Sequence, residues 1–302
     1  MSAGEHFRIA GLSVSVYDQC LASGGATTLN PAYDPFRVDP DPTPDVVVHA
    51  SCGEIKLPPA DEQGPTCTAL FWNSYTSRGR LVVALSHSGG PAWRMAIRDG
   101  SRWDVTTSSA TPREQTNEGL LPHAFVFPLG DLVCLDALSQ RGRLLCHCCG
   151  IVDDVAGAVL FCGRSGRGKS TIGRLWAQTG ATVLNDDRVA VQFHDDTPVA
   201  HGTPWHGDFT QLTATCAPIR AVFYLEHASH TQSEPIDSQQ SIRNLLDATW
   251  HPLWAGAPGV RSLWSQLAQI VPRVPAYRLR FRPDMSAIRE VRRVVLSQKD
   301  PA

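Results

Sequence analysis

The sequence predicts a protein of the α/β class in which a β-rich N-terminal half precedes an α/β half. Short apolar or alternating runs separated by turn residues fill residues 1–125 and are typical of strands. Strand-like runs alternate with helical apolar spacing in residues 126–302, where a glycine-rich loop joins a strand to a helix. The polar composition of residues 106–122 marks the boundary, so we expect two domains.

The N-terminal half shows strand patterns without a cluster of catalytic residue types. Residues 7–16 alternate in part, and residues 46–48, 81–85 and 93–97 are short apolar runs. Prolines interleaved with aspartates between residues 30 and 45 predict a loop. Because this half lacks an arrangement that suits chemistry, we expect it to recognise a substrate or partner.

The C-terminal half reads as alternating strands and helices. Helices are predicted over residues 129–139, 171–180, 241–250, 260–270 and 285–296, and strands over 143–152, 158–162, 181–184, 189–193, 198–201, 219–225 and 276–281.

The glycine-rich loop matches the phosphate-binding pattern G-x-x-x-x-G-K-S. It consists of Gly163, Arg164, Ser165, Gly166, Arg167, Gly168, Lys169, Ser170 and Thr171. Its glycines let the backbone turn several N–H groups towards one point, and the following helix adds its dipole to that anion site. Lys169 can reach the outer phosphates, and the Ser170 hydroxyl can ligate Mg²⁺. The loop therefore predicts binding of ATP with Mg²⁺.

An acid pair follows the first strand after the loop helix. If that strand runs parallel beside the loop strand, it delivers Asp186 and Asp187 next to the phosphates. Because adjacent strand residues face opposite sides, we expect different roles: one carboxylate lies on the Mg²⁺ side and the other accepts a proton from an attacking hydroxyl. Asp186 is the candidate metal ligand with Ser170, and the sequence leaves open which carboxylate is the base. Alternatively, the pair only ends the strand or binds Arg188.

His147 is a further candidate, because it lies in the predicted strand that forms a hairpin with the loop strand. A histidine in an apolar strand can be a packed core residue, or it can approach the γ-phosphate or orient an acid. The sequence leaves both interpretations open.

Nine cysteines are scattered along the chain. The odd count and the absence of a signal peptide predict reduced thiols. Cys146, Cys148 and Cys149 flank His147, but neighbouring strand residues face opposite sides and no second ligand pair follows at zinc-site spacing. We therefore expect these cysteines to be small buried core residues.

The charge balance excludes some classes of partner. The chain has 27 Lys and Arg residues against 29 Asp and Glu residues, which argues against nucleic acid or a membrane surface as partner. The first ten residues lack an apolar signal core, and no apolar run is long enough to span a membrane. We expect a cytoplasmic protein.

Three segments together resemble the catalytic domain of the HPr kinase/phosphorylase family. They are Leu144–His147, Gly163–Thr171 and Asn185–Val189, in this order and spacing. The resemblance covers residues from about 126 to 285, and the same core belongs to the phosphoenolpyruvate-carboxykinase-like superfamily. Gly202–Trp205 resembles a segment of the HPr-kinase-like branch from bacterial peptide-modification clusters, which includes lasso-peptide kinases.

The resemblance implies a P-loop kinase core and an ATP-dependent Ser/Thr hydroxyl kinase. Lys169 and Ser170 would bind phosphate and Mg²⁺, one of Asp186 and Asp187 would be the base, and His147 would lie nearby. It also implies a homo-oligomer.

The sequence departs from this family at two places. The glutamate- and glycine-bearing signature of HPr kinases is replaced by Gly202–Asp208, and residues 1–125 do not match the family's N-terminal domain. These departures favour a peptide or small-protein acceptor over HPr itself, and they give no support for the reverse phosphorylase activity.

Two other functions remain open from the sequence. A catalytically silent ATP-binding regulatory or scaffold protein would keep the Lys169 loop and hold a partner with the N-terminal half. Carboxykinase-type chemistry on a small acid would need further metal ligands and an arginine clamp, which the sequence does not place.

Overall fold

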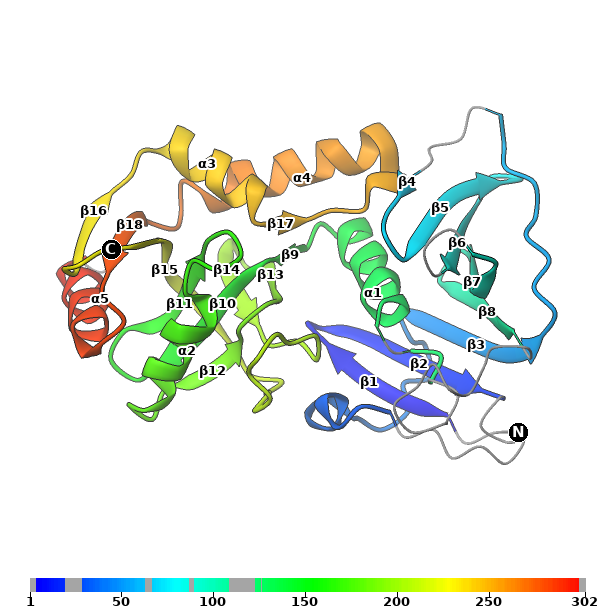
Figure 1. Ribbon diagram of the computed structural model, residues 1–302, viewed down its shortest axis with the longest axis horizontal. Helices are drawn as coiled ribbons and strands as arrows, with labels where there is room; N and C mark the ends of the chain where they lie inside the picture. The colour runs from blue at the N-terminus through cyan, green and yellow to red at the C-terminus, as the bar shows by residue number, and fades with distance from the viewer. Residues whose placement is uncertain are drawn as a thin grey trace. The chain divides into compact units, whose positions relative to one another are not determined.

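The chain divides into two compact units, each built around one large mixed sheet (Figure 1). The computed structural model describes residues 4–19, 29–62, 67–86, 90–108, 123–125 and 127–298. The first unit comprises Met1–Ala137 and Pro252–Val260, and the second comprises Leu138–His251 and Arg261–Ala302. The predicted α/β class is confirmed at this level. The division differs from the one at residue 125, since the first unit continues to Ala137 and includes a returning segment.

The sheet of the first unit is mainly antiparallel. Its strands are β1 (Glu5–Ile9), β2 (Leu12–Asp18), β3 (Val46–Gly53), β4 (Cys67–Thr68), β5 (Trp72–Ser77), β6 (Arg80–Ser86), β7 (Ala92–Asp99) and β8 (Arg102–Ser108), and a 3₁₀ helix, η2, covers Pro31–Phe36. Within the described residues the order is β1-β2-β3-β8-β7-β6-β5-β4, and β3 runs parallel to both β2 and β8. The β-rich character of this half is confirmed.

The strand predicted over residues 7–16 is a hairpin. Ala10 and Gly11 adopt positive φ angles of 48° and 75° and turn the chain between β1 and β2. Gly11 tolerates this conformation, which explains why a partly alternating run is broken at its centre. Of the polar boundary segment, residues 106–108 complete β8, and residues 109–122 lie outside the described residues.

The second unit contains the predicted phosphate loop. Its strands are β9 (Leu144–Cys146), β10 (Cys148–Asp153), β11 (Gly157–Cys162), β12 (Thr182–Asn185), β13 (Val189–His194), β14 (Thr197–His201), β15 (Cys216–His227), β16 (Gln232–Pro235), β17 (Thr249–Trp250) and β18 (Ala276–Phe281). The helices of the described chain are α1 (Leu129–Gln140), α2 (Lys169–Ala177), α3 (Ser238–Asp247), α4 (Gly256–Ile270) and α5 (Met285–Ser297), with the 3₁₀ helix η4 (Leu253–Ala255). No helix in the described part is long and apolar enough to cross a membrane.

Two pairs of strands in this sheet are interrupted opposite one another. The single strand predicted over residues 143–152 breaks at His147 into β9 and β10, and β12 and β13 are separated by residues 186–188. β9 pairs with β13 and β10 pairs with β12, so Cys146 lies opposite Val189 and Gly150 lies opposite Asn185. The two interruptions therefore bring His147 and the acid pair to the same place.

Strand β12 reaches the expected edge of the sheet by another route than predicted. It is not the direct neighbour of β11, because β10 lies between them and is antiparallel to both. β11 and β12 therefore run in the same direction, and their carboxyl ends meet at one edge of the sheet. The hairpin partner β10 occupies the position that we expected for β12.

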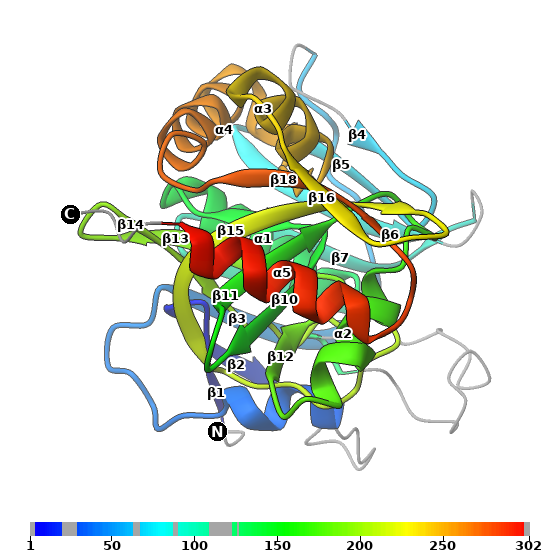
Figure 2. The same cartoon turned by 90° about the vertical axis from the view of Figure 1, so that its left-hand side faces the viewer.

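The two faces of this sheet are covered by different helices. Phe161 and Phe223 pack with residues of α2 and α5 on one face, and Leu160 and Val222 pack with residues of α3 and α4 on the other. Figure 2 shows α5 lying across the strands on its face of the sheet. The alternation of neighbouring residues between two apolar layers explains why the core strands read as continuous apolar runs.

The helix predicted over residues 241–250 ends earlier than expected. α3 stops at Asp247, and Thr249 and Trp250 form β17, which pairs with β9. The open edge of β9 supplies the hydrogen-bonding partners that end the helix, a long-range effect that helical spacing does not reveal.

Most of the described cysteines are free and buried, whereas Cys67 is partly exposed and Cys216 is exposed. Cys146, Cys148 and Cys149 are free and fully buried, as predicted for core residues. Burial raises the pKa of Cys146 to about 12, which keeps this thiol neutral. Cys52 is disulfide-bonded, so the prediction that all thiols are reduced is wrong there. Disulfide pairing depends on Cα separations that the fold sets, and the scattered spacing of the cysteines does not encode them.

A carboxylate ties α5 to the sheet. Glu290 accepts hydrogen bonds from the Ser233 backbone N–H (3.0 Å) and hydroxyl and from the Arg293 guanidinium (2.8 Å). The hydrogen bond from Arg293 is the main cause that lowers the pKa of Glu290 to about 2, with Ser233 adding to it against the effect of burial. A carboxyl with a lowered pKa stabilises the fold above its unfolded pKa of 4.5, and this contribution is lost as pH falls towards 2.

We expect Glu290→Gln to lower the free energy of unfolding at neutral pH, because the variant loses the carboxylate that accepts from Arg293 and Ser233. The expected loss is only about 1 kcal/mol, because solvent screens the exposed Arg293. The difference from the wild type should shrink as pH falls from 4.5 to 2. Urea unfolding at a series of pH values measures both quantities. Glu54→Gln, at a largely exposed side chain (76%), is the control and should show no such pH dependence. A constant difference across this range would contradict the assignment.

Candidate functional site

The glycine-rich loop connects β11 to α2 and presents the start of that helix. Gly166 and Gly168 adopt φ angles of 79° and 93°, and α2 begins at Lys169. A Cβ at Gly168 would lie 2.8 Å from the Phe281 ring, so both the backbone and the available space require glycine there. No side chain caps the helix N-terminus, which leaves the first N–H groups available to an anion.

Lys169 folds back over the beginning of the loop. Its Nζ donates hydrogen bonds to the carbonyl oxygens of Gly163 (2.9 Å) and Arg164 (3.4 Å), and the residue is 8% exposed. The carbonyl oxygens at the start of the loop thereby hold the ammonium group over the loop.

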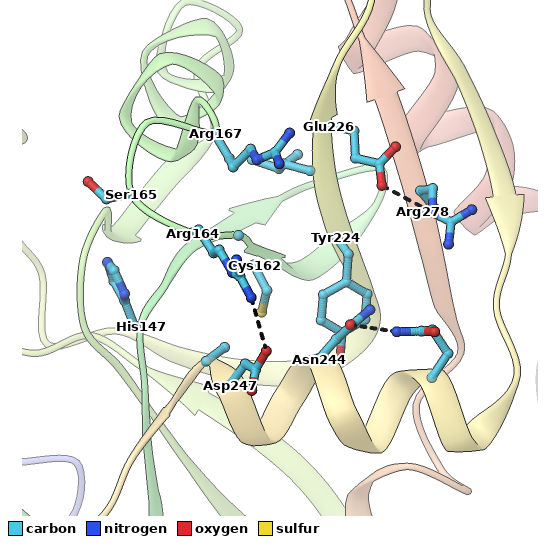
Figure 3. Close-up of a pocket in the computed structure, with 14 residues that line it drawn as sticks. His147, Cys162, Arg164, Ser165, Arg167, Tyr224, Glu226, Asn244, Asp247 and Arg278 are labelled. Carbon is cyan, nitrogen blue, oxygen red and sulfur yellow. Dashed lines mark hydrogen bonds and ion pairs between the residues drawn. The ribbon is translucent and has the colours of Figure 1, made fainter.

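Two cavities border the loop. The first has a volume of about 430 Å³ and is lined by the loop residues Gly163, Arg164, Ser165 and Arg167, by Tyr224, Leu225 and Glu226 of β15, by Gln240, Asn244 and Asp247 of α3, and by His147, Cys162, Ala248 and Arg278 (Figure 3). The second has a volume of about 370 Å³ and is lined by His147, Ser165, Gly166, Gly168, Lys169, Ser170, Thr171, Arg174, Asp186, Asp187, Gly207, Asp208 and His227. His147 and Ser165 line both cavities.

The second cavity gathers most of the residues that the sequence selected. The acid pair, His147, Lys169 and Ser170 all lie on its wall, together with Thr171. Gly163, Arg164 and Arg167 line the first cavity instead. The Arg164 side chain is 86% exposed and lies 4.0 Å from Asp247, an ion pair that contributes little to stability.

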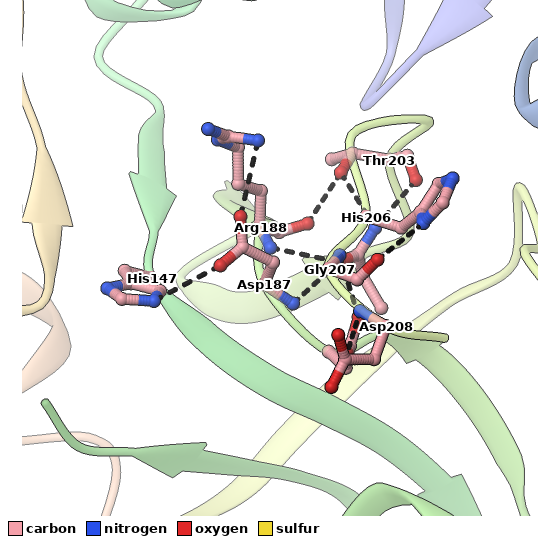
Figure 4. A network of polar contacts seen from close by, with 9 residues as sticks. His147, Asp187, Arg188, Thr203, His206, Gly207 and Asp208 are labelled. Carbon is pink, nitrogen blue, oxygen red and sulfur yellow. Dashed lines mark hydrogen bonds and ion pairs between the residues drawn. The ribbon is translucent and has the colours of Figure 1, made fainter. Parts of the chain in front are cut away.

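His147 contacts Asp187, the second member of the acid pair, directly (Figure 4). Its Nε2–H donates to Oδ1 of Asp187 at 3.1 Å, and Arg188 lies 3.2 Å from Oδ2 of the same carboxylate. The His147 side chain is therefore partly exposed and bonded to an acid, rather than packed in the core. The pairing of Asp187 with Arg188 is also present, so Asp187 has two positively polarised neighbours.

The surroundings of Asp187 keep its carboxylate ionised. Burial raises its pKa, but the hydrogen bond from His147 and the positive charges of Arg188 and Lys169 lower it more, so the pKa lies below the ordinary value of 3.8. At neutral pH this group is therefore a negatively charged acceptor facing the second cavity.

Asp186 is held in a different way. Its carboxylate accepts hydrogen bonds from the backbone N–H groups of Gly207 (2.9 Å) and Asp208 (3.1 Å), and the residue is 2% exposed. The expectation that the two aspartates face opposite sides is wrong, because β12 ends at Asn185 and both carboxylates line the same cavity. Their partners, rather than opposite faces of a strand, distinguish them.

Two residues that the sequence did not suggest hold the acid pair in place. The Asn185 Oδ1 accepts hydrogen bonds from the N–H groups of Asp187 (2.8 Å) and Arg188 (2.9 Å), and its Nδ2 donates to the Thr203 carbonyl (2.9 Å). The Thr203 hydroxyl donates to the Arg188 carbonyl at 2.5 Å. An asparagine that ends a strand and bonds the backbone two residues on is a local turn signal, and it could have indicated Asn185.

The segment Gly202–Asp208 packs closely around this turn. A Cβ at Gly202 would lie 1.9 Å from the Thr213 carbonyl oxygen, and a Cβ at Gly207 would lie 3.1 Å from Oδ2 of Asp186. Glycine at both positions lets the segment approach the acid pair closely enough for its backbone to donate to Asp186. The segment Gly202–Asp208 thus has a local structural role here.

Two aromatic side chains border the site and were also missed. His227 lies with Nε2 2.9 Å from the Gly166 carbonyl oxygen and so fixes the tip of the loop. The Arg188 guanidinium lies over the Trp250 ring at 5.3 Å, and the His147 ring is 6.3 Å from the same ring. Trp250 comes from the short strand β17, whose position depends on pairing with β9.

Oxygen ligands for a divalent cation lie together in the second cavity. The Ser170 hydroxyl and the Asp186 carboxylate line the same wall. The described residues contain no cluster of three or more His, Cys, Asp or Glu side chains with metal-binding geometry. Mg²⁺ in phosphoryl-transfer sites takes one or two protein carboxylates and completes its shell with water and phosphate oxygens, and these two residues fit that requirement.

No protein-family model and no curated protein sequence matches this chain. The resemblance to HPr kinases therefore stays a prediction.

We expect Thr203→Val to lower the free energy of unfolding by about 1–3 kcal/mol, because it leaves the Arg188 carbonyl without its donor inside a buried turn. Thr203→Ser keeps the hydroxyl and is the matched control, with an expected loss below about 1 kcal/mol. Urea denaturation followed by circular dichroism measures both. Equal stability of the valine and serine variants would show that the hydroxyl does not hold the turn.

Proposed function

We propose that the chain is an ATP- and Mg²⁺-dependent kinase with an HPr-kinase-like P-loop core. It transfers the γ-phosphoryl group of ATP to a Ser or Thr hydroxyl of a peptide or small protein. The observation that carries the proposal is the second cavity, whose wall joins Lys169, Ser170 and both aspartates to His147. A phosphate-binding loop alone does not distinguish a kinase from a nucleotide-binding scaffold, whereas an ionised carboxylate oriented beside the loop favours phosphoryl transfer.

The triphosphate would bind at the N-terminus of α2. The uncapped N–H groups of that helix and the Lys169 ammonium supply donors and positive charge at one point. Because the loop is held by Gly168 against Phe281 and by His227 on Gly166, its donors are positioned before the ligand arrives. Such preorganised groups stabilise charge on the transferring phosphoryl group.

Ser170 and Asp186 would hold Mg²⁺, which, when bound, neutralises part of the phosphate charge. Asp186 suits this role because the neutral donors of Gly207 and Asp208 fix its orientation.

Asp187 would accept the proton of the acceptor hydroxyl. As that proton moves to Asp187, the hydroxyl oxygen bonds to the γ-phosphorus, the bond from the γ-phosphorus to the β–γ bridging oxygen breaks, and ADP leaves. Its lowered pKa makes Asp187 a weak base, but a loose transition state requires little proton transfer before the phosphoryl group moves. His147 would orient the carboxylate through its hydrogen bond at 3.1 Å and is a positioning residue.

We expect Asp187→Asn to reduce transfer to a peptide by about 10²-fold or more, the usual contribution of a general base, while MgATP affinity stays near that of the wild type. The assay combines γ-labelled ATP and Mg²⁺ with a library of serine-centred peptides of degenerate flanking sequence. Asp186→Asn should instead raise the Mg²⁺ concentration needed for half-maximal activity.

Asp195→Asn, at an exposed turn outside both cavities, makes the same chemical change and is the control. Transfer that survives both site substitutions would contradict the base assignment. Tight ATP binding without transfer to any peptide of the library would favour the scaffold function instead.

A further inference from the structure

The first cavity begins where the reacting end of a bound nucleotide would lie. In phosphate loops the lysine reaches the β- and γ-phosphates. Here the Lys169 Nζ lies at the carbonyls of Gly163 and Arg164, and both of these residues line the first cavity. The γ end of the triphosphate is thereby directed to the junction of the two cavities, and the nucleoside lies at the other end of the triphosphate.

His147 and Ser165 mark this junction, because they line both cavities. His147 also donates to Asp187 at 3.1 Å. A hydroxyl that enters from the first cavity would thus meet the γ-phosphate beside the group that positions the base.

The wall that α3 contributes carries a complementary pair of amide groups. Gln240 Nε2 donates to Asn244 Oδ1 at 2.8 Å, one helical turn apart on α3 (Figure 3). This bond uses the side-chain carbonyl of Asn244 and one N–H of the Gln240 side chain. Within the described part of the chain, no hydrogen bond uses the side-chain carbonyl of Gln240 or the side-chain amine of Asn244. Both side chains are half-buried on the cavity wall.

Four of the five charged Arg, Asp and Glu side chains that line this cavity form ion pairs, and Arg167 is the one for which the described residues supply none. Arg278 pairs with Glu226 at 3.3 Å, and the Tyr224 hydroxyl donates to the Ser241 carbonyl. Paired charges do not favour a polyanion in this cavity. A neighbouring carbonyl acceptor and amine donor match the backbone N–H and C=O of one residue in an extended peptide, because these two groups point to the same side of the strand.

We propose that the first cavity binds the acceptor peptide in an extended conformation, and that the Gln240 side-chain carbonyl and the Asn244 side-chain amine bind the backbone N–H and C=O of one residue next to the phosphorylated residue. This inference rests on the kinase function proposed above. Backbone recognition of this kind fixes the position of the acceptor while leaving its side-chain sequence to other contacts.

The test uses the full chain, MgATP and the serine-centred peptide library. We expect Asn244→Ala and Gln240→Ala each to raise the peptide KM about fivefold to tenfold, the loss of a single neutral hydrogen bond, with kcat changed less than twofold. MgATP affinity, measured by titration calorimetry, should stay within twofold of the wild type. Arg243→Ala, an exposed residue of the same helix outside both cavities, is the matched control and should change neither quantity.

Two outcomes would overturn the inference without touching the kinase function. One is a lower MgATP affinity in Asn244→Ala with an unchanged peptide KM, which would place the nucleobase in this cavity. The other is phosphorylation of peptides with unchanged KM in both variants. Failure of the kinase function reads differently: the wild type would bind MgATP or peptides but transfer no label. In that case, fluorescence anisotropy of labelled peptides still tests the inference. Weaker peptide binding by Asn244→Ala than by the wild type supports it. Equal binding by the two proteins, or no peptide binding by the wild type, overturns it.

Discussion

The interruption of two paired strands opposite one another is the constraint on which the candidate site depends. β9 pairs with β13 and β10 pairs with β12, and the pairing is interrupted around His147 and residues 186–188. An opening in a buried sheet leaves backbone groups that need partners. Asn185 and Thr203 supply them, which fixes a turn that a free chain would not keep. The same opening releases the side chains of His147 and Asp187 from the two faces of a regular sheet, so that they can meet.

The two aspartates show how surroundings divide one residue type into two roles. Asp186 is bound by neutral N–H groups and is nearly buried, whereas Asp187 faces a histidine and an arginine and has a lowered pKa. Under the proposed function, Asp186 binds the cation and Asp187 accepts the proton of the acceptor hydroxyl. The difference arises from which loop packs on each side chain: Gly207 and Asp208 on Asp186, and the strand break at His147 on Asp187. Neighbours in sequence can therefore act separately without lying on opposite faces of a strand.

The sequence predicted the local features well and the long-range ones poorly, for a physical reason. The strand before Gly163 and the helix after Gly168 follow from apolar spacing and glycine within a short window, and both are confirmed. The position of β10 between β11 and β12, the short strand β17 and the disulfide at Cys52 depend on pairing between distant segments, which spacing does not encode. Asp186 and Asp187 line one cavity together with the loop, but the argument from alternating faces failed because the strand ends at Asn185.

The glycine-rich loop lines two cavities with different chemical surroundings. A phosphoryl donor in water hydrolyses, so an enzyme that transfers to a hydroxyl benefits when the acceptor itself excludes water from the γ-phosphate. Here the second cavity contains Lys169 and both aspartates. The first contains amides, an aromatic side chain, two ion pairs and Arg167. Among the described residues, His147 and Ser165 are the pair that line both cavities. An acceptor in the first cavity would close that junction, so that the base and the donor meet the hydroxyl only when the peptide is bound.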